Sequence, residues 1–94
     1  MNLLYKFFDF EGELNKAGYN VLGRMQTNEA IFIFQMIADL FPESANAWDS
    51  LAEGYLKAGD KNKALEYYNK ALKMDPNGET GKNASKMIKE INNN

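Results

Sequence analysis

The sequence predicts an all-α protein, an α-solenoid in which antiparallel helix pairs stack beside one another. Three observations predict this class. Apolar residues recur every three or four positions along most of the chain, which is the spacing of one helix face. Glycine- and proline-containing stretches interrupt that spacing at short intervals. The whole pattern returns after 34 residues, so we expect two helix pairs followed by one closing helix.

The 34-residue shift keeps the size of the side chains even where their identity changes. Large apolar residues fall on large ones, alanine falls on alanine and proline falls on proline. The matched pairs include Leu14 with Trp48, Val21 with Tyr55, Leu22 with Leu56, Ala30 with Ala64, Phe34 with Tyr68 and Pro42 with Pro76. A single helix pair cannot bury its apolar face alone, so we expect the stacking of units to create the core.

The clearer of the two units spans residues 45–78. Its first helix carries Trp48, Leu51 and Tyr55 on one face. Gly59 is expected to end this helix in the left-handed conformation, and the following Asp60 is expected to cap the next helix. The second helix ends before Pro76, because proline cannot continue the hydrogen-bond ladder. The unit is therefore predicted to be a helix, a tight turn and a second helix.

This unit resembles a tetratricopeptide repeat, a 34-residue helix-turn-helix motif. The residues that carry the resemblance are Trp48, Leu51, Ala52, Tyr55, Gly59, Ala64, Tyr68, Ala71 and Pro76. Residues 11–44 resemble a second, diverged copy, in which Gly18, Ala30, Phe34 and Pro42 fit the pattern. Met25 stands where the turn glycine belongs and Gly23 lies two positions earlier, so the turn of this copy is expected to be shifted or displaced by a few residues.

The pattern also predicts how the helices pack. Ala30 and Ala64 are small, so the two helices of each pair can approach closely. We expect Trp48, Tyr55 and Tyr68 to fill the wider gaps between neighbouring pairs.

The two ends of the chain differ from the repeats. Residues 79–91 are predicted to form a capping helix, with Ala84, Met87, Ile88 and Ile91 on one face and lysines on the other, followed by a frayed tail at 92–94. Residues 1–10 form an apolar segment that is expected to extend the first helix. Its large apolar residues either cover the open end of the first repeat or mediate self-association; they are Leu3, Leu4, Phe7, Phe8 and Phe10.

Composition excludes several classes of function. The chain has no cysteine and no histidine, so it lacks the thiol nucleophile, the usual general base and the commonest metal ligands. We therefore expect no catalytic residue, no metal ion and no cofactor. A net charge of -2 gives no basic field for nucleic acid, and no apolar run is long enough for a membrane span. Lys6 and Asp9 interrupt the apolar start, which argues against a secretory signal and predicts a cytoplasmic protein.

Asp49 and Glu53 are the acidic pair that needs comment, because they lie four residues apart on one helix. Paired carboxylates can exchange protons or hold a divalent cation. Nothing else in the sequence completes a ligand shell, so we expect both side chains to lie on a solvated helix surface.

The resemblance implies a working surface on the concave side, where the first helix of each repeat lines a groove for a peptide or partner segment. Carried over by position, the groove residues are Asn15, Lys16, Tyr19, Leu22, Asn46, Asp49, Ser50, Glu53 and Lys57. A specialised version of the family clamps a terminal carboxylate with basic side chains. Asp49 and Glu53 would repel a carboxylate, so we expect a basic or mixed ligand instead.

Three hypotheses for the function follow. The first is a non-catalytic protein-interaction module that binds a peptide or partner in the groove. The second is an accessory repeat domain of a larger enzyme, because the stretches 15–19 and 45–51 look like the repeats that trail bacterial serine-hydrolase domains. The third is a structural homodimerisation unit that uses the N-terminal aromatic cluster.

Overall fold

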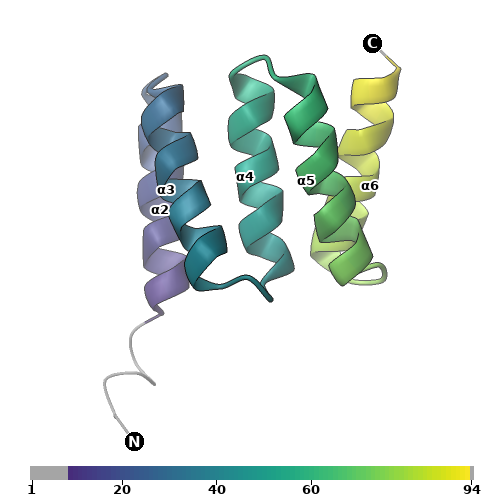
Figure 1. The fold of residues 1–94 in the computed structure, drawn as a ribbon, viewed down its shortest axis with the longest axis horizontal. Coiled ribbons are helices and arrows are strands. Elements are labelled where there is room, and N and C mark those ends of the chain that lie inside the picture. The colour runs from purple at the N-terminus through teal and green to yellow at the C-terminus, as the bar shows by residue number, and fades with distance from the viewer. Residues whose placement is uncertain (1–8, 94) are drawn as a thin grey trace, which may run out of the picture.

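The computed structural model describes residues 9–93, which form five α-helices and, within that range, no strand. The helices are α2 (Phe10–Gly23), α3 (Thr27–Leu40), α4 (Ala45–Lys57), α5 (Lys61–Met74) and α6 (Glu79–Asn92). They stand side by side, and successive helices run in opposite directions (Figure 1). The all-α solenoid predicted from the sequence is confirmed. The positions of Leu3, Leu4, Phe7 and Phe8 lie outside the described residues.

Local capping fixes where the helices begin. The side chains of Asp9, Ser44 and Asp60 accept hydrogen bonds from backbone N–H groups three residues on, at 2.9, 3.3 and 3.1 Å. Each of these caps satisfies a donor that has no partner inside its helix. Asp9 therefore marks the beginning of α2, and Phe10 is its first residue.

The turn of the first helix pair lies in the same register as that of the second, so the expected shift of this turn was wrong. Met25 adopts a φ of 66°, and Gly59, which lies 34 positions later, adopts 89°. The hydrogen bonds repeat as well: Gln26 N donates to Val21 O at 3.1 Å, and Asp60 N donates to Tyr55 O at 2.9 Å. The hydrogen bonds of the turn hold methionine in a left-handed conformation that costs a non-glycine residue about 1–2 kcal/mol.

Tight packing within the first pair depends on Gly18. A Cβ atom at this position would lie 2.4 Å from the ring of Phe34, so the aromatic ring occupies the space that any side chain would need. Phe34 is itself fully buried, and Tyr19 packs edge-on against it at 5.0 Å. Close approach of α2 and α3 is therefore possible because position 18 has no side chain.

The aromatic residues between the repeats divide into two groups. Tyr68 is 1% exposed, which agrees with its predicted role in the core. Trp48 and Tyr55 are only half-buried, and both stack on Tyr67, with ring centroids 5.6 Å apart in each pair. Tyr67 was missed by the sequence analysis. The indole N–H of Trp48 donates to Pro42 O at 3.0 Å, which ties α4 to the loop that precedes it.

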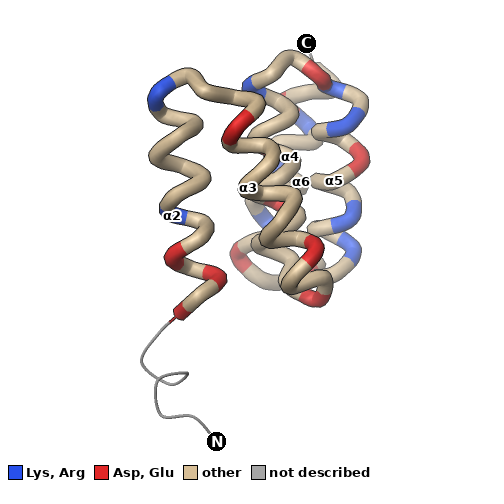
Figure 2. Tube along the Cα trace, turned by 60° about the vertical axis from the view of Figure 1, so that its left-hand side comes forward, with Lys and Arg blue, Asp and Glu red and all other residues tan. Residues whose placement is uncertain are grey.

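The helix order places α4 at the centre. It packs against α3 and α5, and it also contacts α2 and α6. The first helices of successive pairs, α2 and α4, and the closing helix α6 therefore follow one another along one face of the solenoid, which we call the inner face. Lysine and arginine residues lie mainly toward α5 and α6, whereas acidic residues gather at the start of α2 (Figure 2).

Candidate functional site

The inner face is held together by polar side chains that join α2 to α4. The hydroxyl of Tyr19 donates a hydrogen bond to Glu53 Oε1 at 2.9 Å and lies 3.3 Å from Ser50 Oγ. Ser50 Oγ donates to Asn15 Oδ1 at 2.8 Å. Burial, with the nearby charges of Glu53 and Asp49 as smaller causes, raises the pKa of Tyr19 well above its ordinary value. Tyr19 is therefore a neutral hydrogen-bond donor at any physiological pH.

A second polar contact joins α4 to α6. Asn83 Nδ2 lies 3.1 Å from Asp49 Oδ1 and 3.2 Å from Asp49 Oδ2. Asp49 is 8% exposed, and burial raises its pKa to about 6, with a further increase from Glu53 that the amide of Asn83 opposes. Asn15, Asp49 and Asn83 are spaced by 34 residues, so the same repeat position supplies a polar side chain on all three inner helices.

Several of the residues predicted for the groove are buried rather than exposed. Ser50 is 1% exposed, Asp49 is 8% exposed and Leu22 is 9% exposed. The expectation of a solvated surface at Asp49 was wrong, because Asn83 of the closing helix covers its carboxylate. Glu53, which was expected to lie beside it on the same surface, is half-buried.

The remaining predicted groove residues keep some exposure. Lys16, Asn46 and Lys57 are exposed, whereas Asn15 and Tyr19 are half-buried like Glu53. Lys16 forms an ion pair with Glu13 at 3.4 Å on the surface of α2. The predicted set therefore divides into a buried polar layer and a partly open rim.

The structure brings four of the predicted residues to one open hollow of about 340 Å³ on the inner face. It lies between the end of α2 and the second half of α4, and its lining residues are Tyr19, Leu22, Gly23, Met25, Glu53 and Lys57. We call it the inner hollow. Met25 is 87% exposed, so the left-handed turn presents a flexible apolar side chain at its edge. The sequence analysis gave Met25 no role in the site.

The electrostatics of the inner hollow depend on Glu53. Among residues 9–93 no lysine or arginine nitrogen lies within 4 Å of its carboxylate, which accepts the hydrogen bond of Tyr19. Asp49, one turn earlier on α4, adds a second carboxyl group beneath it. An apolar floor with a carboxylate at its side is suited to a ligand side chain that has an aliphatic stem and a basic end.

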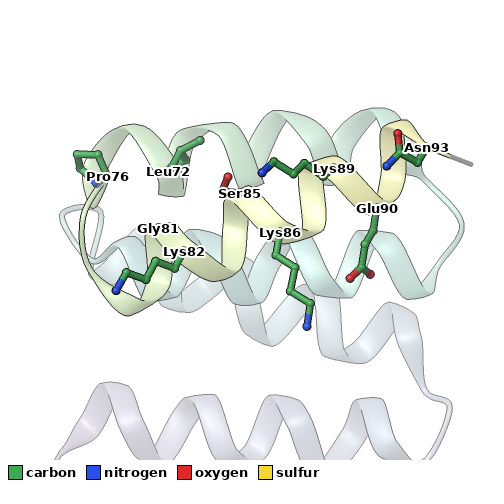
Figure 3. A pocket seen from close by; sticks show the side chains of 9 residues that line it. All are labelled: Leu72, Pro76, Gly81, Lys82, Ser85, Lys86, Lys89, Glu90 and Asn93. Atoms are coloured by element: carbon green, nitrogen blue, oxygen red, sulfur yellow. The ribbon is translucent and has the colours of Figure 1, made fainter.

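Another hollow, of about 480 Å³, lies at the C-terminal end of the solenoid. It is formed mainly by α6, which contributes Lys82, Ser85, Lys86 and Lys89, with Leu72 of α5 at its base. The ammonium groups of the three lysines point in different directions (Figure 3). They form a hydrated basic surface and do not converge on one point.

The described residues offer little for catalysis or metal binding. Residues 9–93 contain no cluster of three acidic side chains that could hold a metal ion. No helix within this range is long and apolar enough to cross a membrane.

Comparison with known proteins places the second helix pair in a family. Residues 45–77 match the family model described as Tetratricopeptide repeat. The chain carries a tetratricopeptide repeat. Tetratricopeptide repeats generally mediate protein–protein interaction, and the family is generally non-catalytic. The resemblance inferred from Trp48, Tyr55 and Pro76 is thereby confirmed for this repeat.

A curated relative adds support for the repeat. It is the Arabidopsis thaliana protein named Protein CTR9 homolog, which is 34% identical to this chain over 47 residues. The match covers 50% of this chain and 4% of the relative. The tetratricopeptide repeat is therefore what the two proteins share, in a relative that is far longer than this chain.

Proposed function

We propose that this chain is a protein-interaction module that binds an extended segment of a partner along the inner face, with a lysine or arginine side chain of the partner in the inner hollow. The observation that supports the proposal is the position of Glu53. It lies beside Leu22 and Met25 in an open hollow, and its carboxylate has no cationic partner within the described residues.

The chemistry of the hollow favours a basic side chain over the alternatives. The aliphatic stem of a lysine or arginine can pack on Met25 and Leu22, while its charged end donates to Glu53. A terminal carboxylate of the partner would instead face Glu53 and the carboxyl group of Asp49. Lys57 is placed on the rim, where it can contact an acidic residue that follows the basic one in the partner.

The buried layer beneath the hollow has a separate task. Asn15, Ser50 and Tyr19 hold α2 against α4, and Asn83 holds α6 against the same helix. These hydrogen bonds fix the spacing of the helices that line the groove. A rigid groove loses less conformational freedom when it binds an extended peptide, which raises affinity.

The proposal is tested by selecting peptides from a random library on the full chain. We expect enrichment of lysine or arginine at one position, and Glu53→Gln should remove that preference while keeping the hydrogen bond from Tyr19. The loss in affinity for an enriched peptide should be on the order of tenfold, as for one partly exposed charge pair. Glu66→Gln on the exposed surface of α5 is the matched control and should change nothing.

Selected peptides without a basic preference, or an equal effect of the two glutamine variants, would contradict the proposal. The other two hypotheses stay predictions. No feature of residues 9–93 favours an accessory domain of a hydrolase over a free-standing module. Self-association through the N-terminal apolar residues is one of the outcomes of the experiment described below.

A further inference from the structure

The side of the first helix pair that faces away from α4 is apolar, and we call it the N-terminal end face. On α2 it carries Leu14, Ala17 and Val21, and on α3 it carries Phe32, Ile33 and Met36. Val21, Phe32 and Ile33 line an open hollow of about 600 Å³. Phe32 is 72% exposed. Within the described residues nothing covers this surface.

The second repeat shows what covers the same positions there. Leu14 and Ala17 correspond to Trp48 and Leu51 after the 34-residue shift. Leu51 is fully buried in one core cluster with Ile37 of α3, and Trp48 bonds the backbone of Pro42. The cover on α4 is therefore supplied by residues 35–42, the end of the preceding helix and the loop that follows it.

The same shift places residues 1–8 in the register of residues 35–42. Leu3 falls on Ile37, which is 1% exposed, and Phe7 falls on the half-buried Phe41. Leu4 falls on Ala38, which is also buried. Tyr5 and Phe8 fall on Asp39 and Pro42, which are both exposed. Leu3 and Phe7 are thus large apolar residues at positions that contact the next helix in the second repeat.

We propose that residues 1–8 dock on the N-terminal end face of the same chain, with Leu3 and Phe7 packed against Leu14 and Ala17. The segment precedes Asp9 directly, as residues 35–42 precede the start of α4 closely. This direct connection gives the segment a high effective concentration at the face, which favours it over a separate molecule. The docking involves a different surface from the inner hollow and does not depend on the proposed function.

The test compares two double variants of the full chain. Leu3→Ser/Phe7→Ser removes the two side chains that are expected to face α2, and Tyr5→Ser/Phe8→Ser removes two aromatic side chains that are expected to face solvent. We expect the first variant to lower the melting temperature by about 10 °C or more and the second by about 2 °C or less. Sedimentation should show monomers of the wild type at all concentrations.

Equal melting temperatures of the two double variants would overturn the proposal. A wild-type dimer that dissociates in Leu3→Ser/Phe7→Ser, with a melting temperature that rises with protein concentration, would also overturn it, because a second copy would then cover the face. If the first variant does not fold, Phe7→Ala and Leu14→Ala are combined instead. The double loss should then be smaller than the sum of the single losses, and strict additivity would count against the contact.

Discussion

The two ends of the solenoid differ at the same repeat positions. At the N-terminal end these positions hold Leu14, Ala17, Gly18 and Val21; in the middle they hold Trp48, Leu51, Ala52 and Tyr55; at the C-terminal end they hold Lys82, Ser85, Lys86 and Lys89. Lysine replaces the bulky residues where no further helix follows among residues 9–93 (Figure 3). Apolar residues remain at the opposite end, as expected of a surface that receives a cover.

The comparison teaches that polarity, and not helix formation, closes this repeat array. Helix α6 packs on α5 through Ala84 and Ile91, in the way that α4 packs on α3. Its other face meets water because long charged side chains take the places of Trp48 and Tyr55. One apolar and one charged end also prevent head-to-tail stacking of separate molecules, since the two surfaces are not complementary.

Leu51→Ala should have the largest effect on stability. Leu51 is fully buried between the repeats, so the variant should lose about 2–5 kcal/mol of unfolding free energy in urea titrations. Ser85→Ala changes the equivalent position at the C-terminal end and serves as the control. It should stay within about 0.5 kcal/mol of the wild type. Equal losses at both positions would mean that the two faces are not distinguished by burial.

Asp49→Asn should stabilise the protein at neutral pH by on the order of 1 kcal/mol. Folding raises the pKa of Asp49 from 3.8 to about 6 because the carboxylate is buried. The folded state therefore holds its proton more tightly than the unfolded state. The contribution of this group to stability is greatest below pH 3.8 and is lost as the pH rises through about 6.

The pH dependence gives the check on that variant. Urea titrations between pH 4 and pH 7 should show wild-type stability falling relative to Asp49→Asn over this interval. A constant difference between the two proteins would contradict the raised pKa. Since Asn83 ties Asp49 to α6, the same experiment reports how firmly the C-terminal end is attached.

Met25→Gly should stabilise the N-terminal pair by about 0.5–1 kcal/mol, because glycine adopts the left-handed conformation without the clash of a Cβ atom. Gly59→Ala, the reciprocal change in the second pair, should destabilise by about 1 kcal/mol. Thermal melts of both variants measure the effect. Stabilisation of the second pair by Gly59→Ala would show that the two turns are not equivalent.

Lys82→Leu/Lys89→Leu should have the smallest effect on unfolding, within about 0.5 kcal/mol, because both side chains are exposed. It should nevertheless make the C-terminal end apolar, so that the protein self-associates with increasing concentration. Sedimentation velocity detects this directly. Lys61→Leu/Lys73→Leu on α5 is the control for two lost charges, and a monomeric Lys82→Leu/Lys89→Leu protein would weaken the role given to the lysines.

Much of the fold was accessible from the sequence, because the repeat exposes its own register. Ser44 and Asp60 cap the helices where the pattern placed them, and Tyr68 is buried as predicted. The turn at Met25 was not accessible. The signal there was the alignment of Met25 with Gly59, but a methionine in a left-handed conformation runs against the local preference of the residue.

The site was predicted less well, because polarity alone does not reveal which polar residues pair with one another. Ser50 and Asp49 read as solvent-facing positions, yet Asn15 and Asn83 on neighbouring helices satisfy their hydrogen bonds and allow burial. The recurrence of Asn15, Asp49 and Asn83 at 34-residue spacing was the available signal. Tyr67 was missed for the related reason that its partners, Trp48 and Tyr55, lie on another helix.

The central position of α4 has a consequence for how the molecule opens. Helices α2 and α6 can each detach while the rest keeps its contacts, whereas α4 touches every other described helix. Backbone amides at the two ends should thus exchange with deuterated solvent through local fraying. Those in the middle of α4 should exchange only when the whole chain unfolds, so the slowest amides of the protein report its global stability.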